Sequence, residues 1–438
     1  MPKLPVPSTM RAMQTLVKIC FALLGLLLPW HGAITVFLPE PFRWWKEAVL
    51  LVLLGIVLWN EVGKIRAKSW EKFSRAQRWA IGFLVWCLTL VILSEDQATA
   101  AIAARYLGMG FVTFLIVSRT QPVSKNALKI FANFFFLGLA TSIIFGLWVK
   151  WGGGAEIVQN FYSNTISSWV PGQTIPLWHE TGGFIRMQGA SSGPTVFSHL
   201  LVAGLALLLW RGPTLNVWLK MGLGILFLAG IAQSFSRAAL GGAFLLVFFS
   251  FLPSLKLSAK KAIPFLLLLF LVGGGFLFLN KNIVQNFLSR DGTSAHFSRP
   301  VEAVEMGLRS PLWGNLGELG PAARARNLEE NNDDRAPIAE NVPADWLAQL
   351  GIPGFFLGIG FLVTIFLGAT PLGKGFVVVS FLLMNFATIF DMMPVAITFF
   401  MLFAFWQKSE TISGKGSRSM FSICCRSSCT RACRLWSR

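Results

Sequence analysis

Long apolar segments are the feature that most constrains how this chain can fold. They run for about 17–25 residues, the length that an α-helix needs to cross the hydrocarbon core of a bilayer. Because that core holds no water, backbone groups must pair within each segment, and helices achieve this. Only 13% of the 438 residues are charged, against about 25% in soluble domains. The sequence therefore predicts an all-α polytopic membrane protein.

The positions of the apolar segments predict about twelve transmembrane helices. Their approximate limits are 15–38, 47–62, 79–95, 99–118, 129–150, 195–210, 217–234, 238–253, 263–280, 352–370, 375–391 and 394–407. They define a transmembrane domain at 15–407, between a short N-terminal segment, 1–14, and a basic tail, 408–438. The first apolar run lacks a small-residue cleavage site, so we interpret it as a signal anchor. The cysteines of the tail match no zinc-binding spacing: Cys424, Cys425, Cys429 and Cys433.

The net charge of +18 would suggest a nucleic-acid partner in a soluble protein. Here the lysines and arginines collect in alternate short loops, such as 63–78 and 119–129, which is the pattern of cytoplasmic loops. With the N-terminus inside, the acidic turn Glu95–Asp96 falls outside. We therefore predict an inner-membrane protein with both termini in the cytoplasm, and no nucleic-acid partner.

Two long loops, about 151–193 and 281–344, then fall on the periplasmic side. The second loop is rich in both acidic and basic residues, and a loop of this length usually has a function. Its segments Pro300–Leu308 and Pro343–Leu350 have the pattern of amphipathic helices. We expect this loop to fold as a small helical cap.

Three arginines flank spans on the outer side, against the usual charge bias: Arg186, Arg237 and Arg299. A guanidinium group offers a planar fork of donors that suits phosphate oxygens. Three converging arginines would hold a pyrophosphate at the membrane surface. Alternatively, each one anchors to lipid headgroups or pairs with a nearby acid.

Motifs around these arginines follow one another in a fixed order: Arg186-x-x-Gly189 with Pro194, Ser236–Leu240, Arg299 with Pro311–Gly314, and Glu340–Asn341 with Leu347–Gly354. In this ordered set the chain resembles the family of O-antigen ligases and polymerases, the WaaL/Wzy-type membrane glycosyltransferases. The chain departs from the family pattern at three positions. Thr195 replaces the asparagine after the proline, Leu316 interrupts a glycine run, and Glu340 replaces the histidine of the ligases.

The resemblance implies transfer of a glycan from an undecaprenyl-pyrophosphate carrier to an acceptor outside the cytoplasm. It implies a metal-independent, inverting enzyme without a cofactor, and the sequence has no Asp-x-Asp motif. Arg186, Arg237 and Arg299 would stabilise the pyrophosphate. Glu340, partly buried against the membrane, would accept the proton of the acceptor hydroxyl. We favour lipid A-core as the acceptor, as in a ligase, over another lipid-linked repeat, as in a polymerase, or a protein.

Further residues are candidates for binding the glycans. His179 lies in the first long loop, and His296 is an alternative base close to Arg299. Asp345 either caps a helix or binds sugar, and Asn341 belongs to the motif at the end of the second loop. The tryptophans best placed to stack on sugar rings are Trp313 and Trp346.

Two interpretations from other functional classes compete with the enzyme. A transporter without chemistry would have charged residues in mid-span and repeated halves. Asp391, at the end of a span, is the only such hint. A membrane sensor would use the large loop only to bind glycan.

Overall fold

The computed structural model describes most of the chain: residues 8–66, 73–120, 126–154, 179–181, 184–210, 215–251, 290–331, 338–387 and 392–407. Three features predicted from the sequence lie outside the described residues: the span 263–280, Asp391 and the tail 408–438. The described part is predominantly helical, with one short β-hairpin.

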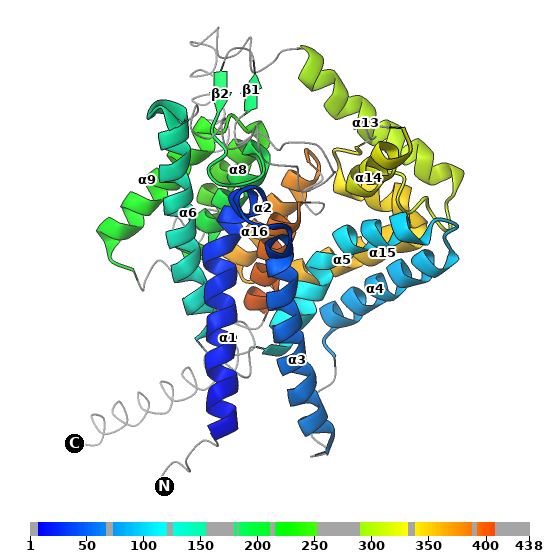
Figure 1. Ribbon diagram of the computed structural model, residues 1–438, viewed down its shortest axis with the longest axis horizontal. Coiled ribbons are helices and arrows are strands. Elements are labelled where there is room, and N and C mark those ends of the chain that lie inside the picture. The colour runs from blue at the N-terminus through cyan, green and yellow to red at the C-terminus, as the bar shows by residue number, and fades with distance from the viewer. Residues whose placement is uncertain are drawn as a thin grey trace, which may run out of the picture.

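The first part of the chain forms a series of helices, most of them long (Figure 1). They are α1 (Ser8–Leu27), α2 (His31–Phe37), α3 (Trp45–Arg66), α4 (Arg75–Leu93), α5 (Gln97–Thr120) and α6 (Ala127–Trp151). The 3-10 turns η1 (Leu28–Trp30) and η2 (Glu40–Trp44) flank α2.

The second part begins with the hairpin β1 (His179–Thr181) and β2 (Phe184–Arg186). The helices that follow are α8 (Pro194–Trp210), α9 (Val217–Gln233), α10 (Arg237–Phe251), α13 (Arg290–Arg309), α14 (Gly320–Asn331), α15 (Val342–Gly368), α16 (Pro371–Met384) and a last helix, Met393–Gln407. The helices expected at Pro300–Leu308 and Pro343–Leu350 are confirmed within α13 and α15.

Five of the described helices are long and apolar enough to cross a membrane: Met10–Phe37, Arg75–Leu93, Gln97–Thr120, Ala127–Trp151 and Val342–Gly368. The expectation of about twelve such spans is therefore met only in part. Shorter apolar helices occupy several of the other positions, among them α8 and α9 with 17 residues each. At about 1.5 Å per residue, such a helix extends about 26 Å, less than a hydrocarbon core of about 30 Å.

Two helices are buried on nearly all sides at the centre of the bundle. In α8 the residues from Val196 to Leu208 are buried, and so are those of the last helix from Val395 to Trp406. A helix that is apolar all round suits either a protein core or a membrane span, and burial shows that these two lie in the core. To one side, α4, α5 and α15 lie together, with α13 and α14 packed against them (Figure 1).

The helix α15 has one break, at Gly351, where φ is +65°. A side chain there would approach the carbonyl oxygens of Pro311 and Leu312 to within 2.8 Å. The amide of Ile352 donates to the Pro311 oxygen at 2.7 Å. Glycine is favoured here because it alone accepts this conformation and this close approach at little cost. The loop after α13 is thereby fixed directly to α15.

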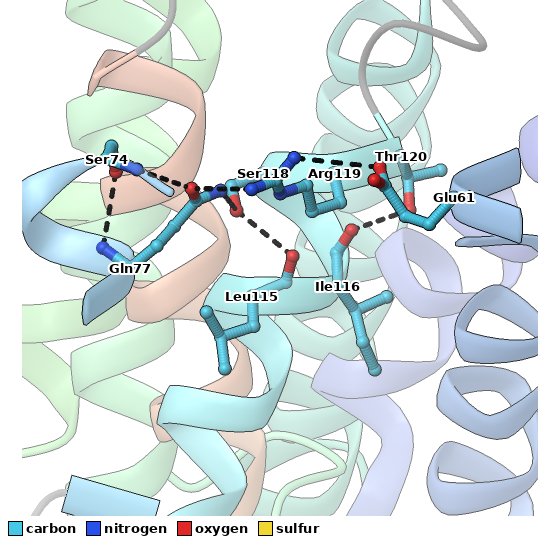
Figure 2. A network of polar contacts seen from close by, with 8 residues as sticks. All are labelled: Glu61, Ser74, Gln77, Leu115, Ile116, Ser118, Arg119 and Thr120. Carbon is cyan, nitrogen blue, oxygen red and sulfur yellow. Dashed lines mark hydrogen bonds and ion pairs between the residues drawn. The ribbon is translucent and has the colours of Figure 1, made fainter. Parts of the chain in front are cut away.

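A polar network joins α3, α4 and α5 at one end of these helices (Figure 2). Arg119, which is 7% exposed, lies 3.6 Å from Glu61 and donates to Gln77 Oε1 at 3.4 Å. Gln77 in turn donates to Ser118 at 2.8 Å and forms a capping box with Ser74 at the start of α4. The network therefore fixes two helix ends and one helix start relative to one another.

Replacing Arg119 with alanine should destabilise the protein by about 3 kcal/mol, because the Glu61 carboxylate would lose its buried ionic partner. The measurement is the midpoint of thermal unfolding of the purified protein in detergent. Arg78→Ala is the matched control, since Arg78 is exposed on α4 and should have little effect. Equal midpoints for the two variants would contradict the structural role of the network.

Candidate functional site

The segment that carries Arg186 is held by three neighbouring helices. Arg186 ends β2, opposite His179 of β1, and a buried turn, Met187–Ser192, follows it. In that turn the Ala190 amide donates to Ser142 Oγ of α6 at 2.9 Å. The Ala190 oxygen accepts from the Ala33 amide of α2, also at 2.9 Å. Bonds made by the backbone of this turn, one of them to the short side chain of Ser142, therefore set the position of Arg186.

The turn between α9 and α10 brings Arg186 and Arg237 together. The Met187 amide donates to the Gln233 oxygen at 3.0 Å, and Arg186 Nε donates to the Ser234 oxygen at 3.0 Å. Arg237 is the first residue of α10. Burial, and then the positive charge of Arg237, lower the pKa of the Arg186 guanidinium from its ordinary value. An arginine nevertheless remains charged at neutral pH.

Lys150, which the sequence analysis did not single out, reaches the same turn from the last turn of α6. Its Nζ donates to Gln233 Oε1 at 2.7 Å. It also lies 5.3 Å from the ring centroids of Phe235 and Trp151, within the range of cation–π attraction. The turn is therefore surrounded by three basic side chains from three separate elements.

Arg299 and Glu340 form an ion pair between α13 and the residue that precedes the cap of α15. The Arg299 side chain is 42% exposed and that of Glu340 is 17% exposed. Asn341 caps α15, because its Oδ1 accepts from the Ala344 amide at 2.9 Å. The Arg299 side chain is therefore accessible, while the backbone next to Glu340 is held by the capped start of α15.

The helix α16 connects the two groups of residues. It runs antiparallel to α10, since Gly242 packs against Leu383 and Phe249 packs against Gly375. The start of α10, with Arg237, therefore lies toward the Asn385 end of α16. There Asn341 Nδ2 donates to Asn385 Oδ1 at 3.0 Å. Arg237 and the residue next to Glu340 are consequently placed at the same end of the α10–α16 pair.

Both parts of this region contain an unusual backbone conformation. Among the described residues, only Phe235 (φ +51°) and Glu340 (φ +52°) combine a positive φ with a side chain. Such a conformation costs on the order of 1–3 kcal/mol and tends to occur at functional sites. One of the two residues lies in the turn before Arg237, and the other is the proposed base itself.

Two of the residues predicted to bind sugar, Asp345 and Trp346, are buried in α15. Trp346 is fully buried against Phe83 and Phe111, so the expectation that it stacks on sugar is corrected to a role in the helix core. Asp345 is 2% exposed and accepts from Gln349 at 2.9 Å, which makes it a buried helix residue rather than a surface ligand for sugar.

Trp313 stays accessible, with 51% of its surface exposed, although one face stacks on Trp86 with ring centroids 5.6 Å apart. The polar atoms of Asn341 are used by the cap of α15 and by Asn385. The backbone of His179 lies in β1 and that of His296 in α13, and their side chains are outside the described residues.

No group of three or more His, Cys, Asp or Glu side chains that could hold a metal ion is found within the described ranges. No protein-family model matches this chain, and comparison with characterised proteins gives no significant match.

Replacing Gly189 with alanine should displace the turn that carries Arg186. Gly189 has φ +57°, and a methyl group there would lie 2.5 Å from Phe197 and would also collide with Ser142. We expect a lower thermal unfolding midpoint and faster proteolysis between β2 and α8. Gly241→Ala is the matched control, because a methyl group at Gly241 meets nothing within 4 Å. If the two variants behave alike, the packing described for this turn is incorrect.

Proposed function

We propose that this protein is an inner-membrane glycosyltransferase of the O-antigen ligase and polymerase type. It transfers a glycan from an undecaprenyl-pyrophosphate carrier to an acceptor on the periplasmic side, with lipid A-core as the acceptor. The observation that carries the proposal is the meeting of Arg186 and Arg237 at the α9–α10 turn. The arginines come from segments about 50 residues apart, and they belong to the motifs on which the resemblance rests.

The arrangement of the helices supports an orientation with this site outside. The Arg119 network lies at the end of α5, close in the chain to the start of α6, whereas Lys150 lies at the end of α6. Because α6 has 25 residues, about 37 Å of helix separates the two ends. If the basic loops around Arg119 are cytoplasmic, the Arg186–Arg237 pair is periplasmic.

The chemistry would be a single displacement at the sugar. The acceptor hydroxyl attacks the anomeric carbon, the bond from that carbon to the pyrophosphate oxygen breaks, and its electron pair stays on the pyrophosphate. Arg186 and Arg237 stabilise the charge that develops there. The proton of the hydroxyl passes to the carboxylate of Glu340. Arg299, paired with Glu340, orients that carboxylate and contributes a further cation.

Arg237→Ala should reduce transfer by at least about 100-fold, because one donor to the developing charge is lost. The readout is the lipopolysaccharide of cells whose only copy of the gene carries the change. Uncapped lipid A-core together with long lipid-linked polymer is expected for a ligase. Single lipid-linked repeats would indicate a polymerase instead.

The matched control for Arg237→Ala is Arg309→Ala, since Arg309 is an exposed arginine in the last turn of α13. Membrane levels of both variants are compared by immunoblot. Full transfer by an Arg237→Ala protein that reaches the membrane would exclude the enzyme proposal and favour a transporter or sensor.

Glu340→Gln should keep a hydrogen bond to Arg299 but remove the proton acceptor. We expect transfer to fall by about 100-fold or more, while the amount of lipid-linked donor that copurifies with the protein is unchanged. Glu318→Gln is the matched control, because Glu318 also pairs with an arginine, Arg326, at 2.6 Å. Undiminished transfer by the Glu340→Gln protein would remove Glu340 from the role of base.

A further inference from the structure

Lys150 is bound to the α9–α10 turn rather than extended toward the membrane surface. A lysine at the end of a membrane helix ordinarily reaches outward to place its ammonium group in water. Here Nζ donates instead to Gln233 Oε1 at 2.7 Å and lies over the Phe235 ring at 5.3 Å. The side chain of Lys150 is therefore directed to the same turn that receives Arg186.

The partners of Lys150 and Arg186 are neutral. Lys150 donates to a side-chain amide oxygen and Arg186 to a backbone carbonyl oxygen. In the described part of the chain, neither of the two forms an ion pair with a carboxylate. Other basic residues there do pair with glutamates: Lys46, Arg105, Arg119, Arg299 and Arg326. The contrast sets Lys150 and Arg186 apart from these five cations, because the partners of both are neutral oxygens.

Neighbouring cations repel one another, and an anion bound among them relieves the repulsion. Arg237 adds its charge to Arg186 and stands at the start of α10, where the positive end of the helix dipole also favours an anion. The neutral oxygens of Gln233 and Ser234 hold the donors in place without neutralising them. Phe235, with its positive φ, lies between these two residues and Arg237.

We propose that Lys150 is a third phosphate-binding group, and that Lys150, Arg186 and Arg237 together select a diphosphate over a single phosphate. A diphosphate carries more negative charge and more acceptor oxygens than one phosphate group, so it can engage cations from three directions. A lysine suits this position because its ammonium group binds phosphate as a point charge while keeping its bond to Gln233. The inference rests on the proposed function for the identity of the diphosphate in the cell.

The test measures binding of inorganic pyrophosphate and inorganic phosphate to the full chain in lipid nanodiscs by isothermal titration calorimetry. The unaltered protein should prefer pyrophosphate. Lys150→Met should weaken pyrophosphate binding by about tenfold, the loss expected for one charged hydrogen bond, and should reduce the preference over phosphate. Lys150→Arg should retain most of the pyrophosphate affinity and most of the preference for pyrophosphate over phosphate.

The matched control is Lys220→Met, since Lys220 is also half-buried but lies in the first turn of α9, at the opposite end of that helix from Gln233. Its pyrophosphate affinity should be unchanged. An equal loss in both variants, a Lys150→Met protein that binds as tightly as the unaltered one, or no preference for pyrophosphate would each overturn the inference. The thermal midpoint of each variant is measured first, so that a folding defect is recognised, and Lys150→Arg then provides the comparison in a folded protein.

Glycan transfer is assayed separately, which distinguishes the two proposals. Pyrophosphate binding that depends on Lys150, without any glycan transfer, would contradict the enzyme while leaving the diphosphate site intact. Transfer that persists with an unaltered rate and donor KM in Lys150→Met would contradict the inference alone.

Discussion

The hydrogen bonds of the Met187–Ser192 turn are the interaction on which the rest of the site depends. Through backbone atoms this turn is joined to α2 at Ala33 and to the end of α9 at Gln233, and Ser142 joins it to α6. Each buried backbone group would be costly to leave unpaired. The same bonds that satisfy the turn therefore fix the distance between Arg186 and the α9–α10 turn. The turn thereby keeps a fixed position relative to α2, α6 and α9.

Much of the fold could be predicted from the sequence, because a helix that crosses a bilayer needs an apolar segment of a certain length. The helices from Arg75 to Trp151 follow the expected spans closely. The pattern could not show that α8 is enclosed by protein, because apolar side chains suit lipid and protein core equally. Nor could it show that α15 continues from the loop into the bundle, since the break at Gly351 depends on contacts with Pro311, 40 residues away.

The sequence predicted those residues of the candidate site whose charge is unusual for their position next to an apolar segment. In the predicted topology Arg186 and Arg237 depart from the usual distribution of basic residues, and the structure brings them together. Lys150 escaped notice because a lysine at the end of a span is ordinary in sequence, and only its bond to Gln233 distinguishes it. Trp346 was misassigned for the opposite reason. Its residue type suits a sugar site, but which face of its helix meets Phe83 depends on packing between distant segments.

The break in α15 has a mechanical consequence. On one side of Gly351 the helix packs against α13, which carries Arg299, and on the other side it continues as an apolar helix among α4 and α16. Between Glu340 and the break at Gly351 lies only the short helical stretch 342–350. A displacement of the Arg299–Glu340 pair relative to the rest of the bundle would therefore change the dihedral angles at Gly351 and strain the loop bonded to it, and it would also strain the bond between Asn341 and Asn385. The orientation of the Glu340 carboxylate relative to the bundle therefore depends in part on a glycine 11 positions further along the chain.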